Sequence, residues 1–245
     1  MMLAGKRCLI TGGSRGLGLA LGLAFAREGA QVAFTYSQND HDAEEARGLI
    51  AQAGAAPLVF KGSVADAKHV NKTVAELLTA WDGIDVLVNC AGINQVLPIA
   101  LCDEADWDEM MAINVKGVFL YSRAVLKGMI KAKRGHILNI GSFASERMIE
   151  APVHFAASKS AVRGFSEALA REMGRYNIQV NVLCPGLLDV GLAQALPKHR
   201  LDEYLGQCPL GRLARGDEIA RFAVFLVSDR NTFMTGAKLA IDGGL

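Results

Sequence analysis

Three side chains in the middle of the chain have the spacing of a proton-transfer site, but one lacks the necessary atom. Ser142 follows an apolar run typical of a buried strand, and Phe155-Ala-Ala-Ser-Lys159 opens a helical segment. Residues four positions apart share one face of a helix, so the Phe155 ring and the Lys159 ammonium group should project the same way. A tyrosine at position 155 would carry a hydroxyl group for Lys159 to acidify. Phenylalanine carries none, so the function depends on how this gap is interpreted.

A glycine-rich turn lies near the start of the chain, between an apolar run at 8–11 and a helical pattern at 17–27. Its sequence is Thr11-Gly-Gly-Ser-Arg-Gly-Leu-Gly18. Glycines let a backbone approach a pyrophosphate closely, and a helix N-terminus presents free N–H groups to it. The strand–turn–helix context therefore predicts a dinucleotide site rather than a tight turn without a ligand. The predicted contacts in this turn are Gly12, Ser14, Arg15, Gly16, Leu17 and Gly18.

The end of the second predicted strand, at 31–37, indicates which dinucleotide is bound. An acidic residue there would hold the ribose 2′-hydroxyl of NAD, but the positions are Tyr36 and Ser37. Arg15 is available to meet a 2′-phosphate, although it could equally be a solvated loop residue. Asp40 and Asp42 argue for NAD but lie further along the chain. We therefore predict NADP(H).

Short apolar segments alternate with helical patterns along the whole chain. This alternation predicts a single α/β domain over residues 1–245, a doubly wound, Rossmann-like parallel sheet of seven strands with helices on both faces. Ligands of such sheets bind at the carboxyl ends of the strands. Thr11, Asn89, Ser142 and Pro185 lie at such ends, so we expect them to converge.

Composition and charge exclude several classes of protein. The formal net charge is +1, which argues against a surface selected for nucleic acid or an anionic membrane. No apolar run reaches the roughly 18 residues that span a bilayer, and the N-terminus has no signal-peptide pattern. The five cysteines are scattered without a CxxC pair. We therefore expect a cytoplasmic protein without a metal site.

With these motifs in order, the chain resembles the short-chain dehydrogenase/reductase family from end to end, and most closely its 3-oxoacyl-(acyl-carrier-protein) reductases. The glycine turn is similar to the family's TGxxxGxG. The other matching motifs are Asn89-Cys-Ala-Gly92 for NNAG, Asn114 in Ile113-Asn-Val-Lys-Gly117, Ser142, Phe155-x3-Lys159 for YxxxK thirteen residues later, and the tail Thr235–Gly244.

The resemblance implies a role for each matched position. Ser142 would hydrogen-bond the substrate carbonyl oxygen. Lys159 would bind the nicotinamide ribose and lower the pKa of the neighbouring acid. Asn114 would hold a water in a proton relay, and residue 155 would be the acid. The implied cofactor contacts beyond the glycine turn are Tyr36, Ser37, Ser63, Val64, Asn89, Ala91, Gly92, Lys159, Pro185, Gly186 and Leu188.

Three hypotheses account for Phe155. It was introduced into an enzyme that naturally carries tyrosine; the chain reduces its substrate by another proton route, such as Ser142 and water; or it is a non-catalytic dinucleotide binder. His154 is adjacent, but one helical step turns a side chain about 100° away. The glycine turn, Ser142 and Lys159 are intact, which favours a disabled enzyme over a binder.

The resemblance also implies a substrate and partners. The substrate would be a 3-oxoacyl thioester on an acyl carrier protein, or else a polyketide or small ketone. A segment at 188–207 would form a substrate flap. A homotetramer would pair segments 107–131, 155–175 and 237–241. Carriers are acidic, so basic residues near the entrance could dock one, although they could equally form an ordinary solvated face. The candidates are Arg123, Lys127, Lys131, Lys133 and Arg134.

Overall fold

Seven parallel strands form one sheet in a computed structural model that describes residues 1–145, 151–191, 193 and 196–245. The strand order is β3-β2-β1-β4-β5-β6-β7, and all neighbouring strands in it are parallel. The direction of winding reverses between β1 and β4, which confirms the predicted doubly wound sheet. The strands are β1 (Arg7–Thr11), β2 (Gln31–Tyr36), β3 (Leu58–Lys61), β4 (Val86–Asn89), β5 (Gly135–Ile140), β6 (Ile178–Pro185) and β7 (Lys238–Ile241).

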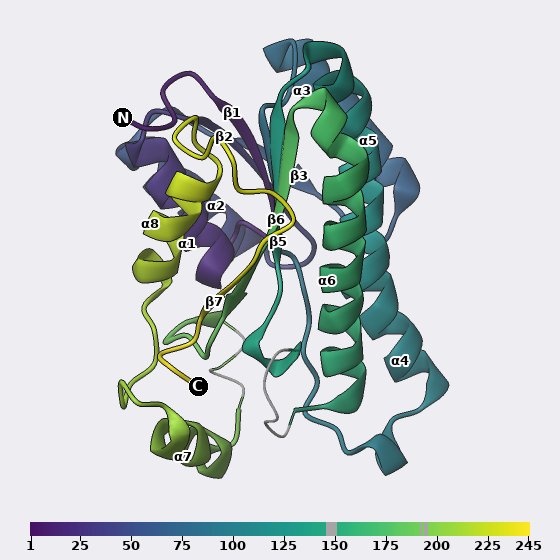
Figure 1. Cartoon of the computed structure of the whole chain (residues 1–245), viewed down its shortest axis with the longest axis vertical. Helices are drawn as coiled ribbons and strands as arrows, with labels where there is room; N and C mark the ends of the chain where they lie inside the picture. The colour runs from purple at the N-terminus through teal and green to yellow at the C-terminus, as the bar shows by residue number, and fades with distance from the viewer. Residues whose placement is uncertain (146–150, 192, 194–195) are drawn as a thin grey trace.

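Helices cover both faces of the sheet (Figure 1). Successive side chains of a strand point to opposite faces. Thus Ile10 packs with α1 (Gly16–Arg27), α2 (Asp40–Ala53) and α8 (Gly216–Leu226). Leu9 instead packs with α3 (Ala67–Trp81), α5 (Gly117–Ala132) and α6 (Val153–Met173). The strands read as continuous apolar runs because both of their faces are buried.

The register brings the predicted strand ends together. Thr11 pairs with Asn89, and Asn89 pairs with Asn139 on β5. The Thr11 hydroxyl oxygen accepts hydrogen bonds from the N–H groups of Cys90 and Ala91, at 3.0 and 3.1 Å. The carboxyl ends of β1, β4, β5 and β6 therefore form one edge, as the sequence predicts.

The predicted helix 107–131 is divided into three pieces. α4 (Glu104–Met111) leads into a π-helical turn (Ala112–Lys116), and α5 then begins at Gly117. Asn114 lies in the π turn, and π turns often occur at functional sites. A Cβ on Gly117 would lie 2.7 Å from Cγ2 of Val64, so only glycine fits where α5 starts. The weak helical character of Asn114 and Gly117 marks this change of geometry.

The predicted flap at 188–207 lies partly outside the described residues, at 192, 194 and 195. Its described part includes a bridge between Leu188 and Ala214 and the helix α7 (Lys198–Gln207). Residues 146–150, between Ser142 and Phe155, also lie outside the described part. Short helical turns complete the described chain: η1 (Ile99–Leu101), η3 (Phe143–Ser145) and η4 (Gly174–Tyr176). Across the described residues, no helix is both long and apolar enough to cross a bilayer.

Candidate active site

Lys159 and Phe155 occupy the same face of α6, at its beginning. The Lys159 Nζ atom lies 5.9 Å from the centre of the Phe155 ring. It donates a 2.8 Å hydrogen bond to the carbonyl oxygen of Ile140, the last residue of β5. Burial lowers the pKa of Lys159 below its ordinary value. The site therefore contains a desolvated cation beside a ring that has no proton to give.

Ser142 lies just beyond β5, in the turn that leads to η3. Its hydroxyl oxygen accepts a 3.1 Å hydrogen bond from the Ala144 N–H, and its carbonyl oxygen accepts one from the Ser145 hydroxyl at 2.8 Å. The side chain is buried, and η3 packs against α6. The bond to Ala144 uses a lone pair of the Ser142 hydroxyl, so within the described residues its hydrogen is free to be donated to a carbonyl oxygen.

Asn114 joins the π turn to the loop after β4. Its Oδ1 atom accepts from the Ile93 N–H at 2.9 Å, and its Nδ2 group donates to the Ile93 carbonyl oxygen and to the Ser158 hydroxyl, both at 3.0 Å. A Cβ on Gly92 would lie 3.2 Å from Asn114 Oδ1 and 3.5 Å from Lys159 Nζ. The family motifs around Gly92, Asn114 and Lys159 thus meet in space.

His154 does not provide the missing acid. Its ring is 0% exposed, and both ring nitrogens lack a hydrogen-bond partner. A substrate atom cannot reach a ring that is fully enclosed by protein. The one-residue offset from Phe155 therefore directs His154 into the interior, as the helical geometry predicts.

The glycine turn fits a pyrophosphate. Gly12 has φ +70° and Gly16 has φ +57°, a backbone region that favours glycine. A Cβ on Gly12 would lie 2.8 Å from the Ala91 Cα, and a Cβ on Gly18 would clash with the carbonyl oxygen of Gly12. The turn ends at the N-terminus of α1, where free N–H groups favour an anion. Leu17 is buried in the core, whereas Arg15 is exposed.

A polar cluster lies at the end of β2, where the ribose of a dinucleotide is expected. The Tyr36 hydroxyl donates to Asp40 Oδ1, and Lys61 Nζ contacts Asp40 Oδ2, both at 2.8 Å. These two bonds, the Lys61 one first, lower the pKa of Asp40. Asp40 is thus closer to the strand end than its sequence position suggests, but Lys61 neutralises it. Lys61 is missing from the predicted site because only the pairing of β2 with β3 brings it beside Tyr36.

The remaining predicted cofactor residues have different surroundings. The Asn89 Nδ2 group donates to Asn139 Oδ1 at 2.8 Å and to the Ser122 hydroxyl at 3.2 Å. Asn89 therefore ties β4 to β5 and α5 inside the protein. The Ser63 hydroxyl oxygen accepts from the Ala65 N–H. The others occupy the same carboxyl edge: Ser14 in the glycine turn, Ser37 after β2, Val64 before α3, and Pro185, Gly186 and Leu188 at and after the end of β6.

The basic cluster at the end of α5 is not beside this site. Lys131, Lys133 and Arg134 precede Gly135, the first residue of β5, whereas Ser142 follows the last. Six residues of strand span about 20 Å. Arg134 also lies 3.3 Å from Asp85, at the start of β4. The expectation that these three residues flank the entrance is therefore wrong, because α5 runs away from the carboxyl edge.

The chain has extensive similarity to known proteins. A family model described as Enoyl-(Acyl carrier protein) reductase matches residues 12–245. The 3-oxoacyl-(acyl-carrier-protein) reductase FabG of Thermotoga maritima is 37% identical over 100% of this chain and 99% of its own length. A D-threitol dehydrogenase of Mycolicibacterium smegmatis is 38% identical over 99% of this chain and 93% of its own.

A solved structure is similar over the same extent. It is a short-chain dehydrogenase of Burkholderia cenocepacia J2315 in complex with NADP, with a TM-score of 0.93, 31% sequence identity and coverage of 100% of this chain and 99% of the other. The sheet order, the glycine turn at the N-terminus of α1 and the meeting of Gly92, Asn114 and Lys159 agree with these matches. The chain belongs to the short-chain dehydrogenase/reductase family of oxidoreductases.

Proposed function

We propose that this protein is an NADPH-dependent ketoreductase that reduces a 3-oxoacyl thioester to the 3-hydroxyacyl form, and that Phe155 impairs it. One observation carries the proposal: Lys159 lies beside the Phe155 ring, Asn114 bonds to Ser158 on the same helix, and the turn that follows Ser142 packs against that helix. Of the four positions that the resemblance matches to a catalytic role, only 155 lacks its functional group. A chain that had lost catalysis long ago would have no reason to keep a buried, desolvated lysine there.

The residues divide the chemistry among them. NADPH, when bound, supplies the hydride for the carbonyl carbon. The Ser142 hydroxyl donates a hydrogen bond to the carbonyl oxygen and stabilises the negative charge that develops on it. That oxygen must then receive a proton, and a positioned acid contributes typically ~10²–10⁴ in rate. Phe155 cannot donate it, so the proton must come more slowly from water near Lys159 and Asn114.

The cofactor assignment rests on the glycine turn and on two cations. Gly12, Gly16 and Gly18 leave the space that a pyrophosphate needs. Arg15 is an exposed cation in the glycine turn that can meet a 2′-phosphate, and Lys61 neutralises the Asp40 carboxylate that would otherwise repel one. The NADP complex of the Burkholderia protein supports the same assignment by similarity.

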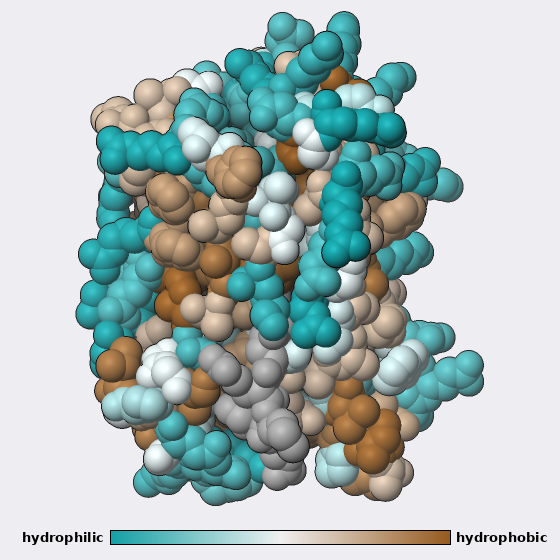
Figure 2. Space-filling view, in the orientation of Figure 1, coloured by the Kyte–Doolittle hydropathy of each residue, from teal (hydrophilic) through white to brown (hydrophobic). Residues whose placement is uncertain are grey.

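The substrate class is supported by the rim of the site as well as by the FabG relative. Apolar side chains are exposed on the segment between β4 and α4, which Figure 2 shows as a brown area at the lower right. Val96, Ile99 and Leu101 are 46%, 56% and 70% exposed. This segment follows Gly92 directly, so it offers an apolar surface to an acyl chain. We extend the proposal to a carrier-bound acyl group and a cytoplasmic homotetramer, as the family likeness implies.

The test compares this chain with its Phe155→Tyr variant in an assay of NADPH oxidation with an acetoacetyl thioester. The proposal expects a rate increase of orders of magnitude in the variant. Equal activity in the two proteins would point to another proton route, with Ser142 as the next residue to replace. If both bind NADPH and both remain inert with the thioester, either the substrate is a different one or the protein is a dinucleotide binder, and a wider panel of ketones separates these two outcomes.

A second candidate function is the oxidation or reduction of a small polyol or ketone. The 38% identity to a D-threitol dehydrogenase favours it. The same pair of proteins, assayed with NADP⁺ and short polyols, separates the two functions. Turnover of a polyol but not of the thioester would replace the first proposal with the second.

A further inference from the structure

Tyr204 is the one residue of α7 that is buried. The helix lies beyond the carboxyl edge of the sheet (Figure 1). The Tyr204 hydroxyl bonds to residues that follow β6 and β7. The other nine residues of α7 are partly or fully exposed. The contacts of Tyr204 therefore decide how the helix sits relative to the site.

The Tyr204 ring packs against the turn that carries Ser142. Its centre lies 5.4 Å from the centre of the Phe143 ring, with an interplanar angle of 69°. Edge-to-face contacts of this kind are favourable beyond the area they bury. Phe143, Tyr204 and Cys208 form a small cluster with Leu187, Leu205, Leu213 and Leu245. Phe143 directly follows Ser142, so the packing of this cluster restrains the backbone next to the serine.

The Tyr204 hydroxyl joins two further segments. Its oxygen accepts a hydrogen bond from the Leu187 N–H at 3.1 Å, and its hydrogen goes to the carbonyl oxygen of Asp242, after β7, at 3.3 Å. Leu187 lies between Gly186 and Leu188, two of the implied cofactor contacts, at the exit of β6, which meets the nicotinamide carboxamide in the reductases that the chain resembles. A Cβ on Gly186 would clash with the Tyr204 hydroxyl oxygen. The Tyr204 hydroxyl therefore occupies the space that a side chain at position 186 would need, and only glycine leaves that space free.

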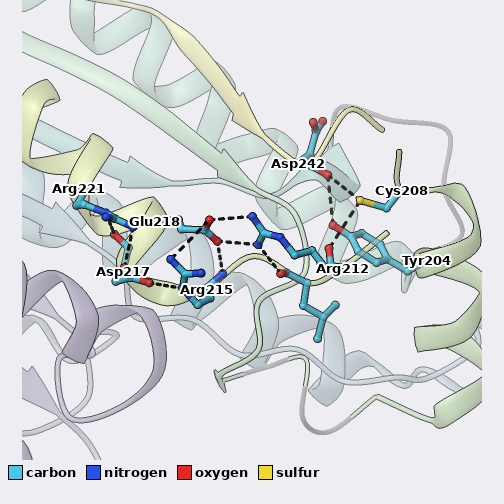
Figure 3. A network of polar contacts seen from close by, with 9 residues as sticks. Tyr204, Cys208, Arg212, Arg215, Asp217, Glu218, Arg221 and Asp242 are labelled. Carbon is cyan, nitrogen blue, oxygen red and sulfur yellow. Dashed lines mark hydrogen bonds and ion pairs between the residues drawn. The ribbon is translucent and has the colours of Figure 1, made fainter. Parts of the chain in front are cut away.

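The segment that connects α7 to α8 is held to α8 by an ion pair some distance from Tyr204. Figure 3 shows Tyr204 and Cys208 beside Asp242, with Arg212 directed towards α8. Two Arg212 nitrogens contact the two carboxylate oxygens of Glu218, both at 2.8 Å. This polar network holds the end of the connecting segment that lies next to α8. The end next to α7 is held by the side chain of Tyr204 and by the Cys208 N–H, which donates to the Tyr204 carbonyl oxygen at 2.9 Å.

We propose that Tyr204 is a positioning residue, whose hydroxyl holds the exit of β6 at the nicotinamide end of the cofactor site and aligns it with the Ser142 turn. The role rests on the proposed function, because it presupposes that NADPH binds at this edge. Tyr204 is a positioning residue and not a catalytic one, because its hydroxyl group bonds to the main chain of Leu187 and Asp242 within the described part of the chain.

The test replaces Tyr204 with phenylalanine and measures two ligands. Tyr204→Phe keeps the ring against Phe143 and removes both hydroxyl bonds, which leaves the partly buried Leu187 N–H without its partner. Such a loss is expected to weaken NADPH binding about tenfold. Adenosine 2′,5′-bisphosphate lacks the nicotinamide, so its affinity should stay unchanged. Gly186→Ala displaces the same hydroxyl and should give the same selective loss.

Tyr176→Phe is the matched control, because Tyr176 lies on η4 and contacts Arg175. It should bind both ligands as the unmodified chain does. The proposal is overturned if Tyr204→Phe leaves NADPH affinity unchanged, or if it weakens both ligands equally, as a general loss of structure would. If the unmodified chain binds neither ligand, the cofactor assignment fails before any substitution is made, and the role of Tyr204 fails with it.

Discussion

The ammonium nitrogen of Lys159 lies 5.9 Å from the centre of the Phe155 ring, one helical turn away, and gives its hydrogen bond to the Ile140 carbonyl oxygen. This separation is at the outer limit of a cation–π contact. The lysine is therefore held by the strand end and not by residue 155. Its charge is in position to acidify a hydroxyl that the chain does not have.

Restoring that hydroxyl should restore the acid. Phe155→Tyr is expected to raise kcat for reduction of an acetoacetyl thioester by about 10²–10⁴, the usual contribution of a positioned acid. Lys159 would lower the pKa of the new phenol, because a nearby positive charge favours its ionised form. The measurement is steady-state NADPH oxidation against pH. Because the protonated phenol is the donor in reduction, the activity of the variant should fall as the pH rises through the pKa of that phenol.

Phe119→Tyr supplies the control for this substitution. Phe119 is 43% exposed on α5, beside Arg123, so a hydroxyl there adds no group to the site. A gain in rate from Phe119→Tyr equal to that from Phe155→Tyr would show that the effect is not one of local acid catalysis.

Removing the Asn114 amide should damage both stability and turnover. Asn114→Leu keeps the approximate volume but leaves the Ile93 N–H and C=O groups without partners, and each orphaned buried group costs about 1–3 kcal/mol. We expect a loss of about 2–4 kcal/mol in the free energy of unfolding, measured with urea. Asn71→Ala on the exposed face of α3 should cost almost nothing. Equal losses in the two variants would contradict the contact network around the π turn.

Asn114 also shows how much of the candidate site could be predicted from the sequence. Its low helical propensity allows either a specific side-chain contact or a backbone-bonded side chain, and the structure has both, because Asn114 bonds to the Ile93 main chain and to the Ser158 hydroxyl. The partner, Ile93, could not be predicted, because the contact depends on how the loop after β4 returns to the π turn. The fold itself was predictable, since apolar strands that alternate with helices admit few other arrangements.

Lys61 and Tyr204 were missed for the same physical reason. Lys61 reaches Asp40 only through the pairing of β3 with β2, and Tyr204 reaches Leu187 only because α7 folds back over the sheet edge. Neither belongs to a local pattern with a fixed spacing. The misplaced basic cluster, Lys131 to Arg134, is the converse case. Its residues are close in sequence to the site but lie at the opposite edge of the sheet.

The cofactor assignment predicts a selective effect at Arg15. Arg15→Gln removes a cation from the glycine turn, and hydrogen bonds to a charged group are worth about 1.5–3 kcal/mol. NADPH affinity should therefore fall at least about tenfold, while NADH affinity stays constant. Arg47→Gln on α2 removes a cation that pairs with Glu44 and should change neither. Nucleotide fluorescence titrations measure all four values, and a parallel loss for NADH would refute a 2′-phosphate contact.

The glycine turn predicts opposite effects from two glycine-to-alanine changes. At Gly18 a Cβ would clash with the Gly12 carbonyl oxygen, whereas at Gly48 on α2 nothing lies within 4 Å. Gly18→Ala should therefore distort the turn and abolish dinucleotide binding. Gly48→Ala should raise the free energy of unfolding by about 0.5–1 kcal/mol, because alanine favours a helix interior. Urea unfolding and NADPH titration test both changes, and normal binding by Gly18→Ala would disprove the tight turn.

The last prediction concerns His136, at the opposite edge of the sheet from the site. Burial, helped by the Lys6 charge and opposed by Asp229, Gln179 and Asp85, lowers its pKa from 6.5 to about 4. Across the described residues, its Nδ1 atom and the Oε1 atom of the neighbouring Gln179 on β6 are buried without a well-formed hydrogen bond. The folded protein therefore keeps His136 neutral at a pH where the unfolded chain binds a proton.

Stability should consequently fall as the pH drops from 6.5 towards 4, because the unfolded state binds more protons in that window. Between pH 7.5 and pH 5 the contribution of His136 amounts to about 2 kcal/mol. Urea unfolding at these two pH values should show His136→Gln losing about 2 kcal/mol less than the unmodified chain. His41→Gln, at an exposed position on α2, should lose as much as the unmodified chain. Equal losses in all three proteins would mean that the His136 imidazole titrates in the folded state as it does in water.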